Sequence, residues 1–377
     1  MLNIGITGQS GFIGTHLYNT LALDPEKYTR IPFKNEYFTT NVKLKTFVQQ
    51  CDVIIHLAAM NRHNDPQVIY QTNIELVNQL IQALEDTNST PHVLFASSTQ
   101  EERDNQYGQS KKAGRLLLEQ WAKKNKAWFT GLVIPNVFGP FGNPYYNSVV
   151  ATFCHQLTHG EQPQIDIDTE LKLIYVGELV AQFINYIGIQ DSENVADVER
   201  ILVPHTARIK VSELLSIIVN FKVDYFEKGI FPNLTDKFTK NLFNTFVCYI
   251  DHSKWFPFHL NLHTDNRGSF VETAKLKSGG QISFSTTVPG ITRGNHFHTR
   301  KSERFAVIKG QAKIEIRRIG TDLKHVFLLN GGRPSFVDMP IWFTHNITNI
   351  GDDDLYTIFW INEEYDSSDP DTYFEEV

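Results

Sequence analysis

The chain has 377 residues, a formal net charge of −7 at pH 7 and a hydrophobic content of 41%. This length predicts two domains, because a single ordinary core does not grow to this size. The negative charge and the lack of a basic block argue against a nucleic-acid-binding protein, and no apolar run approaches the ~18 residues of a membrane span.

The cysteines and the first residues indicate the compartment. Cys51, Cys154 and Cys248 are odd in number, widely spaced and set in apolar runs, which is typical of reduced, buried thiols. The opening residues, MLNIGITG, have neither the basic segment nor the cleavage site of a signal peptide and predict a strand instead. We therefore expect a cytoplasmic protein.

The N-terminal stretch predicts a strand, a glycine-rich turn and a helix. Leu2–Thr7 is apolar, and a helix through Leu23 follows the turn. Such a turn lets the backbone approach a pyrophosphate at the helix N-terminus. The spacing G-x-x-G-x-x-G differs from the basic G-x-G-x-x-G motif, so a turn without a ligand stays open as the alternative. The cofactor-contacting residues would be Gly8, Gly11, Phe12, Ile13 and Gly14.

A second strand, Tyr28–Phe33, should end near the adenosine ribose of a bound dinucleotide. NAD enzymes usually carry Asp or Glu at this point. This chain has Arg30 and Lys34 there, and no acid from Tyr28 until Glu36. Basic groups can meet a 2′-phosphate, so we predict NADPH as the cofactor, with solvated surface charges as the alternative.

The following segments continue an alternation of strands and helices. Asp52–Ala59 is a nearly continuous apolar run, as expected of a strand buried on both faces. A helix over 66–86 and a strand over His92–Ala96 come next. This alternation predicts an α/β fold with a doubly wound parallel sheet of the Rossmann type.

Tyr107 and Lys111 lie four residues apart in the sequence YGQSK, so a helix places both on one face. A nearby ammonium favours the phenolate and lowers the pKa of a tyrosine, which suits a general acid that donates to a carbonyl oxygen as hydride arrives. A hydroxyl from the loop 97–99 could hold the same oxygen. The Y-x-x-x-K pattern alone is weak and gains weight from the glycine-rich turn.

These features together resemble the extended short-chain dehydrogenase/reductase family over about residues 1–245. The resemblance implies a nicotinamide cofactor and a Ser/Thr-Tyr-Lys set. Tyr107 would be the acid/base, Lys111 would hold the nicotinamide ribose, and Ser98, or else Thr99, would supply the hydroxyl. The segment passing under the cofactor would be Leu57, Ala58 and Ala59.

The same resemblance indicates a substrate region. Asn136, in PNVFGP, matches a loop position of sugar-nucleotide members of the family, and an ordinary turn residue is the alternative. Many members have Arg three residues earlier, where this chain has Val133, so a contact from that position is in doubt.

From Phe258 onward the composition changes to short strands and turns, which predicts an all-β barrel. No Gly/Pro-rich linker marks the change, and we place the boundary between about 240 and 256. The predicted domains are 1–245 and 250–377. The acidic tail 363–377 is expected to be a solvated end.

Gly290–Gly310 contains the clearest metal-binding pattern of the chain. His296 and His298 leave the same face of a strand, and Glu303 can return on an adjoining segment. His345, downstream, offers a fourth ligand. Imidazoles with one carboxylate suit zinc, iron, manganese or nickel. The alternative is a barrel whose histidines line a pocket without a metal.

The spacing resembles the cupin signature: Gly, five residues, His-x-His, four residues, Glu, six residues, Gly. Pro340, His345 and Asn349 match the second cupin motif, whereas Trp342 stands where that motif usually has Gly. The stretch Asp265–Glu272 resembles a segment of deoxysugar epimerase cupins, with a hairpin turn as the alternative.

A reductase lobe followed by a metal-type cupin resembles the CapF-type (WbjC- or FnlB-type) enzymes of bacterial capsule and O-antigen synthesis. The resemblance implies a homodimer that epimerises C3 of a UDP-linked 4-keto-6-deoxy-N-acetylhexosamine, a UDP-2-acetamido-2,6-dideoxy-4-hexulose, in the cupin. NADPH would then reduce C4, giving UDP-2-acetamido-2,6-dideoxy-L-talose on the route to UDP-N-acetyl-L-fucosamine. The metal would be Zn²⁺, or another divalent transition metal, held by His296, His298, Glu303 and His345.

Two other classes of function stay open. One is a reductase of single activity whose cupin is structural or oligomerising, and the other is a non-catalytic NADP sensor.

In the bifunctional enzyme, epimerisation should precede reduction, because the C3 proton is removable only while the C4 ketone can take up the developing charge.

Overall fold

The computed structural model describes residues 1–187, 197–265, 268–271, 273–363 and 365–377. These residues form two compact units, each assembled from segments that are separate in sequence. The first draws on Met1–Phe138, Gly142–Val149 and Glu170–Ile209, and the second on Gly139–Phe141, Val150–Thr169 and Lys210–Val377.

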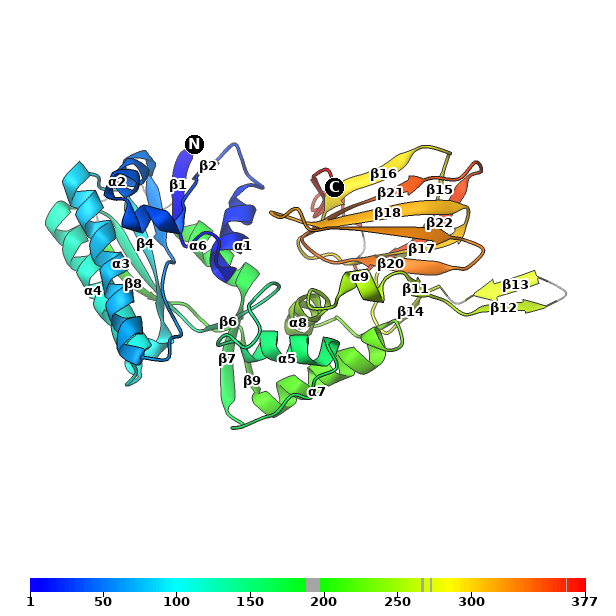
Figure 1. Ribbon diagram of the computed structural model, residues 1–377, viewed down its shortest axis with the longest axis horizontal. Helices are drawn as coiled ribbons and strands as arrows, with labels where there is room; N and C mark the ends of the chain where they lie inside the picture. The colour runs from blue at the N-terminus through cyan, green and yellow to red at the C-terminus, as the bar shows by residue number, and fades with distance from the viewer. Residues whose placement is uncertain (188–196, 266–267, 272, 364) are drawn as a thin grey trace. The chain divides into compact units, whose positions relative to one another are not determined.

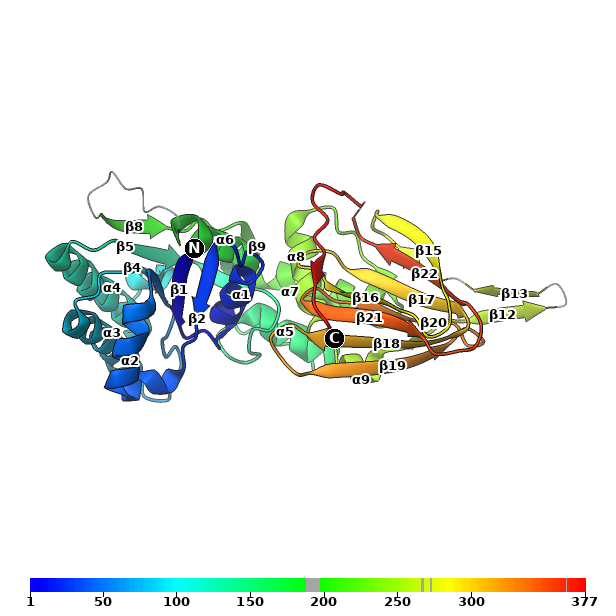
Figure 2. The ribbon, with the colours of Figure 1, turned by 90° about the horizontal axis from the view of Figure 1, so that it is seen from above.

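The first unit contains a six-stranded sheet in the order β2–β1–β3–β4–β5–β8 (Figure 2). All neighbouring strands in it are parallel. Its strands are β1 (Leu2–Thr7), β2 (Tyr28–Ile31), β3 (Val53–His56), β4 (His92–Ser98), β5 (Phe129–Ile134) and β8 (Val198–Leu202). The strand order reverses beside β1 and β3, and open α/β sheets bind ligands at the carboxyl ends of strands at such a point.

Helices cover both faces of this sheet (Figure 1). One apolar core lies under α1 (Phe12–Leu21) and α6 (Val176–Ile187), and the other under α2 (Asn41–Gln50), α3 (Pro66–Thr87) and α4 (Gln106–Asn125). Val53 and Ile55 of β3 belong to the first core and Ile54 to the second. This alternation explains why the strand is apolar at consecutive positions.

Shorter elements complete the first unit. They are the 3₁₀ helices η1 (Asn35–Thr39) and η2 (Thr99–Glu102), and a small sheet in the order β6 (Asn136–Phe138), β7 (Glu170–Tyr175), β9 (Ala207–Lys210). Strand β2 ends at Ile31, two residues before the predicted end. Pro32 has no N–H with which to continue a ladder, and Phe33 turns into the core at 3% exposure.

The strands of the second unit form two five-stranded antiparallel sheets (Figure 1). One has the order β11 (Phe258–His259), β20 (Ser335–Met339), β17 (Glu303–Lys309), β22 (Leu355–Ile361), β15 (Gln281–Thr287), and the other β19 (Lys324–Asn330), β18 (Gln311–Arg318), β21 (Phe343–Asn349), β16 (Thr292–Phe297), β23 (Tyr373–Phe374). Their inner faces share a core that includes Ile314, Val337 and Phe343. The predicted fold class, a Rossmann-type sheet followed by an all-β cupin-like domain, is confirmed.

Two strand pairs and five helical segments accompany these sheets. The pairs are β10 (Ile230–Phe231) with β14 (Lys275–Leu276), and β12 (Leu262–Asp265) with β13 (Gly268–Val271). The helical segments are α5 (Val149–Thr158), α7 (Val211–Phe221), the π-helical η3 (Lys222–Phe226), α8 (Lys237–Val247) and α9 (His252–Trp255). Of the predicted epimerase-like stretch, residues 266, 267 and 272 lie outside the described residues.

The phenylalanine-rich segment before residue 250 packs against the barrel strands. Phe231 lies 4.2 Å from Trp360 of β22 and 5.5 Å from Phe243 of α8, measured between ring centroids. Residues 210–247 therefore belong to the same compact unit as the barrel strands. The division into domains 1–245 and 250–377 stays a prediction.

The expectation that the acidic tail is a solvated end is wrong for its central part. Strand β23 of the tail pairs with β16, and the C-terminus lies beside β16 in Figure 1. Asp371, just before β23, is only 3% exposed. The reason is that its carboxylate satisfies backbone N–H groups of a distant loop, as described below.

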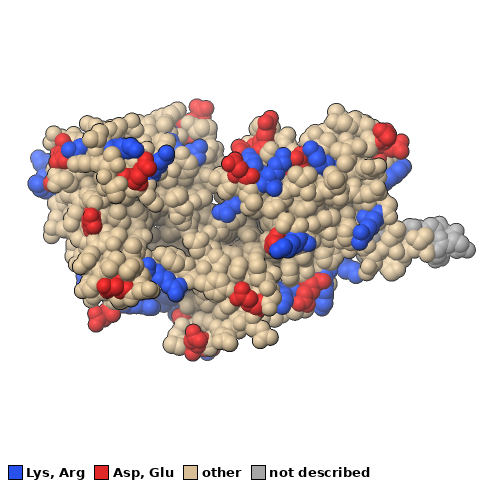
Figure 3. All heavy atoms as spheres, viewed as in Figure 1, with Lys and Arg blue, Asp and Glu red and all other residues tan. Residues whose placement is uncertain are grey.

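The distribution of surface charge and the character of the helices can be compared with the prediction that the protein binds neither nucleic acid nor a membrane. On the face shown in Figure 3, basic and acidic side chains are interspersed. Within the part of the chain that the structure describes, each helix is too short or too polar to cross a bilayer.

Candidate active site and candidate metal centre

A cavity of about 710 Å³ opens in the first unit, at the carboxyl ends of its central strands. The turn after β1, the segment after β3, the end of β4 and the start of α4 all contribute to it. Among the predicted site residues, those that line it are Gly8, Gly11, Phe12, Ile13, Gly14, Leu57, Ala59, Ser98, Tyr107, Lys111 and Asn136. The structure thus brings together residues that are up to 128 positions apart in the sequence.

The glycine-rich turn leaves no room for side chains at two of its positions. Gly8 has a φ of +74°, and a Cβ there would lie 2.9 Å from the Ala58 backbone nitrogen. A Cβ on Gly14 would lie 2.3 Å from the carbonyl oxygen of Gly8. Gly11 forms the N-cap of α1 and offers no side-chain acceptor, so the first N–H groups of the helix are left for a ligand. These residues fit the pyrophosphate of a dinucleotide.

Tyr107 and Lys111 project from the first turns of α4. The side chain of Asn105 caps this helix by accepting from the backbone N–H of Gly108 at 2.8 Å. The Lys111 ammonium donates to the carbonyl oxygen of Ala96 at 2.9 Å and lies 5.8 Å from the centroid of the Tyr107 ring. Phenol and ammonium therefore face one region of the cavity.

Burial controls the protonation of both groups. It raises the pKa of Tyr107 to about 12, with a smaller contribution from Tyr146, and lowers the pKa of Lys111 to about 8. The predicted lowering of the pKa of the phenol is therefore wrong, because burial disfavours the phenolate and raises this pKa. A protonated phenol is nevertheless the form that a general acid needs.

The three hydroxyls of the 97–99 loop are in different surroundings. Ser97 donates to the carboxylate of Glu101. The Ser98 oxygen accepts from the backbone N–H of Gln100 at 3.2 Å, so its own proton stays available to a substrate oxygen. Ser98 lines the cavity and Thr99 is not among the lining residues, which favours Ser98 of the two candidates.

Other predicted positions lie away from the cavity lining. Arg30 stacks its guanidinium 4.3 Å from the Tyr18 ring centroid and donates to the Tyr18 carbonyl, and neither Arg30 nor Lys34 lines the cavity. Their role toward a 2′-phosphate stays a prediction. Val133 is 1% exposed within β5, so its side chain offers nothing to a substrate.

Further polar residues line the cavity beside the proposed catalytic and cofactor-binding residues. Gln100, Asn143 and Tyr146 line the cavity, and Asn147, which also lines it, donates to the Asn61 carbonyl at 2.9 Å. The resemblance to sugar-nucleotide members of the reductase family also implies that residues 143–147 line the substrate pocket, so of these four residues only Gln100 escaped the sequence analysis. The hydrogen bond of Asn147 connects this loop to the segment after β3.

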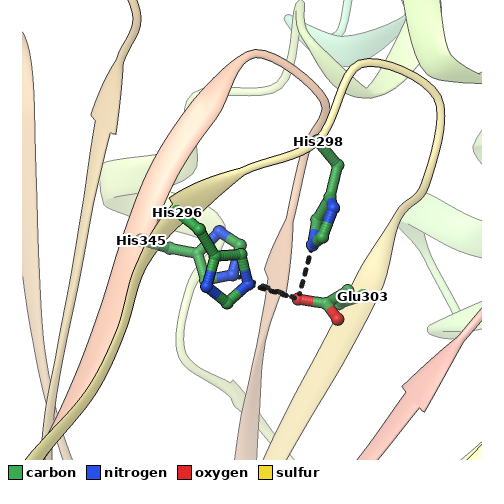
Figure 4. A group of neighbouring side chains, drawn as sticks. All are labelled: His296, His298, Glu303 and His345. Atoms are coloured by element: carbon green, nitrogen blue, oxygen red, sulfur yellow. Dashed lines mark ion pairs between the residues drawn. The ribbon is translucent and has the colours of Figure 1, made fainter. Parts of the chain in front are cut away.

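In the second unit, three histidines and one glutamate converge on one point (Figure 4). His296 lies on β16 and His298 just after it, Glu303 begins β17, and His345 lies on β21. The candidate ligand atoms all lie within 4.8 Å of one another. The Nε2 atoms of His296, His298 and His345 lie 3.9, 3.2 and 3.0 Å from the same Glu303 oxygen. All four predicted metal ligands therefore share one place.

The buried polar atoms of this group lack ordinary hydrogen-bond partners. Nε2 of His298, Nε2 of His345 and Oε2 of Glu303 are buried and make no hydrogen bond. Buried polar atoms without partners call for an explanation, and a bound cation supplies one. Burial lowers the pKa of His345, which keeps this imidazole in the neutral form that binds metal.

The opposite ring nitrogens fix how two of the imidazoles point. Nδ1 of His298 donates to the backbone carbonyl of Asp371, and Nδ1 of His345 donates to that of Phe343 at 3.3 Å. A proton on Nδ1 leaves Nε2 as the metal-binding atom in each ring. The donor set of three imidazoles and one carboxylate fits zinc or a neighbouring transition metal.

Trp342 adopts the backbone conformation that its glycine-like position requires. Its φ is +61°, in the left-handed region that favours glycine. Its N–H donates to the His298 carbonyl at 2.8 Å, and its indole stacks on Phe297 at 5.6 Å between centroids. The backbone geometry of the second cupin motif is thus kept although the residue differs.

Two family models match parts of the chain. Residues 4–188 match the NAD dependent epimerase/dehydratase family, and residues 263–373 match the polysaccharide biosynthesis C-terminal domain. The UDP-2-acetamido-2,6-beta-L-arabino-hexul-4-ose reductase of Pseudomonas aeruginosa is 33% identical over 374 residues, which cover 99% of this chain and 98% of the relative.

A solved structure matches along the full length. The capsular polysaccharide assembling protein CapF of Staphylococcus aureus is 34% identical, with 100% of both chains covered and a TM-score of 0.62. This chain belongs to the CapF family. Outside the CapF family, the structure of RMD from Pseudomonas aeruginosa complexed with NADPH covers 59% of this chain at 22% identity and a TM-score of 0.52, a likeness of fold alone.

Proposed function

We propose that this CapF-family protein is a nicotinamide-dependent nucleotide-sugar reductase of capsular polysaccharide synthesis. Its substrate would be a UDP-2-acetamido-2,6-dideoxy-4-hexulose, whose C4 ketone it reduces with NADPH. One observation carries the proposal: Ser98, Tyr107 and Lys111 line the same cavity as the glycine-rich turn. The activity for which the Pseudomonas aeruginosa relative is named, at 33% identity, supports the substrate class.

The chemistry of the reduction follows from these positions. A bound nicotinamide supplies the hydride that forms the new bond at C4. The C4–O π bond breaks at the same time, and its electron pair takes the proton of the Tyr107 phenol, so that an alcohol results. Ser98 donates a hydrogen bond to the same oxygen, and Lys111 holds the ribose while its positive charge favours the phenolate that is left.

We further propose that the barrel epimerises C3 before the reduction. The C3 proton can leave only while the C4 ketone exists to accept charge. The residues His296, His298, Glu303 and His345 would hold a Zn²⁺ ion, which can polarise an oxygen when it is bound. Lys301 is poorly suited to act as the base that removes this proton, because its ammonium already donates to the Pro370 carbonyl at 2.9 Å.

A second candidate function has a specific observation in its favour. Four protein ligands tend to close a zinc site, and closed sites are structural. In this case the barrel would stabilise the chain, and the protein would be a C4 reductase alone.

One experiment separates these functions. The protein is incubated with a UDP-2-acetamido-2,6-dideoxy-4-hexulose in deuterated water, first without and then with NADPH, and the products are followed by NMR. We expect deuterium at C3 without NADPH and a C4 alcohol after NADPH is added. A C4 alcohol without deuterium at C3 would show that the protein is a reductase of single activity. If no NADPH is consumed, the proposed reductase activity is refuted.

The proposed site residues provide the matching variants. Tyr107→Phe should stop NADPH oxidation while deuterium still enters at C3. His296→Ala combined with His298→Ala should lose bound zinc and deuterium incorporation while a 4-keto substrate is still reduced. These opposite outcomes would assign each step to its own unit.

A further inference from the structure

The C-terminal tail meets the metal-ligand group at the loop between His298 and Glu303. This loop, residues 299–302, runs from the end of β16 to the start of β17. Two of the four proposed ligands thus flank it directly. Any movement of the loop would change the distance between these two ligands.

The carboxylate of Asp371 organises this loop. Its Oδ1 accepts from the backbone N–H of Thr299 at 3.1 Å and from the Thr299 hydroxyl at 2.6 Å. Its Oδ2 accepts from the backbone N–H groups of Arg300 at 3.0 Å and Lys301 at 3.1 Å. Three successive N–H groups directed at one anion form a nest, which here is filled from within the chain.

The backbone of the same segment contacts the ligands themselves. The Asp371 carbonyl accepts the Nδ1 proton of His298. Strand β23 then pairs with β16, with Phe374 opposite His296, and Glu375 donates its N–H to the Asn295 carbonyl at 3.0 Å. Residues 371–375 therefore touch the segments that carry His296 and His298 and the loop that leads to Glu303.

We propose that Asp371 is a positioning residue of the metal centre, and that the tail segment 371–375 sets the metal affinity of the barrel. The inference rests on the metal site of the proposed function and adds a residue 26 positions beyond its last ligand. Asp371 would act on a bound metal only through other residues. Its carboxylate fixes the loop, and its carbonyl fixes the tautomer and orientation of His298.

Burial makes this arrangement costly to disturb. Asp371 is 3% exposed, so its hydrogen bonds have little competition from water. Removing the carboxylate charge would weaken three backbone hydrogen bonds at once, because charged acceptors make stronger bonds than neutral ones. Outer partners of metal ligands typically change metal affinity by about 10–100-fold when they are mutated.

The test compares Asp371→Asn with Asp369→Asn in the full chain. Asp369 lies two residues earlier, its side chain is 66% exposed, and it pairs with the Arg300 guanidinium at 2.8 Å. Both changes remove one acidic charge near the same arginine, but only Asp371 binds the loop amides. Zn²⁺ affinity is measured by competition with a chromogenic chelator, with the unmutated chain as reference.

We expect Asp371→Asn to bind Zn²⁺ about 10–100-fold more weakly and Asp369→Asn to bind within about threefold of the unmutated chain. In the metal-free proteins, ¹⁵N NMR of the histidine rings should show a mixture of His298 tautomers for Asp371→Asn and a single Nδ1-protonated form otherwise. This readout does not depend on activity. NADPH-dependent reduction should be unchanged in the control variant Asp369→Asn.

The outcomes separate the inference from the function on which it rests. If the unmutated chain binds no Zn²⁺, the metal centre itself is wrong and the inference falls with it. If the unmutated chain binds Zn²⁺ and both variants bind Zn²⁺ as tightly as it does, only the role of Asp371 is refuted. Should Asp371→Asn fail to fold, Asp371→Glu decides: the longer carboxylate keeps the charge but misplaces it, and unchanged affinity would overturn the proposal.

Discussion

At the scale of single residues, Trp342 has a backbone conformation that is unfavourable for any residue other than glycine. A non-glycine residue in the left-handed conformation costs about 1–2 kcal/mol. Trp342 has this conformation, yet it is 8% exposed and stacks on Phe297. Packing of the indole therefore offsets the backbone cost at the strand that carries His345.

This balance predicts an unusual ranking of variants. Trp342→Ala should lower the free energy of unfolding by about 3–5 kcal/mol through the lost packing. Trp342→Gly should be at least as stable as Trp342→Ala, because glycine relieves the positive φ. At Trp360, which is 1% exposed and lies within strand β22, glycine should be the worse substitution by about 0.5–1 kcal/mol. Denaturant unfolding measures all four variants, and the same ranking at both positions would contradict the argument.

Lys111 predicts the pH dependence of the reductase. Its pKa of about 8 means that the ammonium predominates below pH 8 and is lost as pH rises through 8, whereas the Tyr107 phenol, with a pKa of about 12, stays protonated. The rate of NADPH oxidation should therefore fall above about pH 8. A rate that stays flat to pH 10 would contradict a role for the ammonium.

The same shift has a consequence for stability with a defined sign. An unfolded lysine has a pKa near 10.4. Between about pH 8 and 10 the unfolded chain therefore binds more protons at Lys111 than the folded chain, and this residue's contribution to the free energy of unfolding rises with pH.

At the scale of elements, the short helix η2 connects a buried ion pair to the cavity. Glu101 in η2 is 5% exposed and accepts from the Arg115 guanidinium at 2.9 and 2.8 Å. Ser98, which caps this short helix, and Gln100, which lies within it, both line the cavity. A Cβ on Gly108 of α4 would lie 1.9 Å from the Gln100 carbonyl, so η2 and α4 approach each other closely.

Glu101→Gln should therefore affect both stability and activity. It leaves the charge of the buried Arg115 less well compensated, which typically costs about 3 kcal/mol or more. It should also slow NADPH oxidation, because it weakens the hydrogen bond that holds Ser97, the neighbour of Ser98. Glu102→Gln is the control, because the Glu102 side chain is 73% exposed and pairs with Arg200 on the surface. Equal unfolding free energies and equal rates for the two variants would show that the buried pair has no such role.

The sequence predicts those elements whose evidence is local. The Gly8–Gly14 turn, the apolar run of β3 and the ligand spacing of β16 and β17 each lie within a short window of the sequence. In the structure the turn lines the cavity of the first unit, and the four ligands converge within the second unit. Asp371 could not be found in this way, because its partners lie about 70 positions earlier in the chain. The raised pKa of Tyr107 could not be found in this way either, since it depends on how deeply the folded chain buries the phenol.

At the scale of the whole molecule, a buried polar network joins the barrel to residues before 245. Asp338 accepts from the Tyr225 hydroxyl at 2.6 Å and from Arg304 at 2.7 and 2.8 Å, and Arg304 also donates to the Gly229 carbonyl at 2.7 Å. Arg304 and Asp338 are each 2% exposed. A barrel without Tyr225 and Gly229 would leave these charges incompletely paired.

We therefore expect a fragment of residues 210–377 to unfold at a higher temperature than one of residues 250–377, with Zn²⁺ present in both samples. The longer fragment keeps the partners of Arg304 and the contact of Phe231 with Trp360. Leaving a buried charge unpaired is strongly destabilising. Equal unfolding temperatures, measured by circular dichroism, would instead support the predicted boundary near 245.

The discontinuous make-up of the two units has a consequence for protein engineering and for recombination between relatives. The chain passes from one unit to the other at 138/139, 141/142, 149/150, 169/170 and 209/210. A single crossover between two genes would therefore give a hybrid in which at least one unit mixes segments from both parents. Exchanging the barrel unit intact requires three grafts, so the two units should be inherited together more readily than domains joined by one linker.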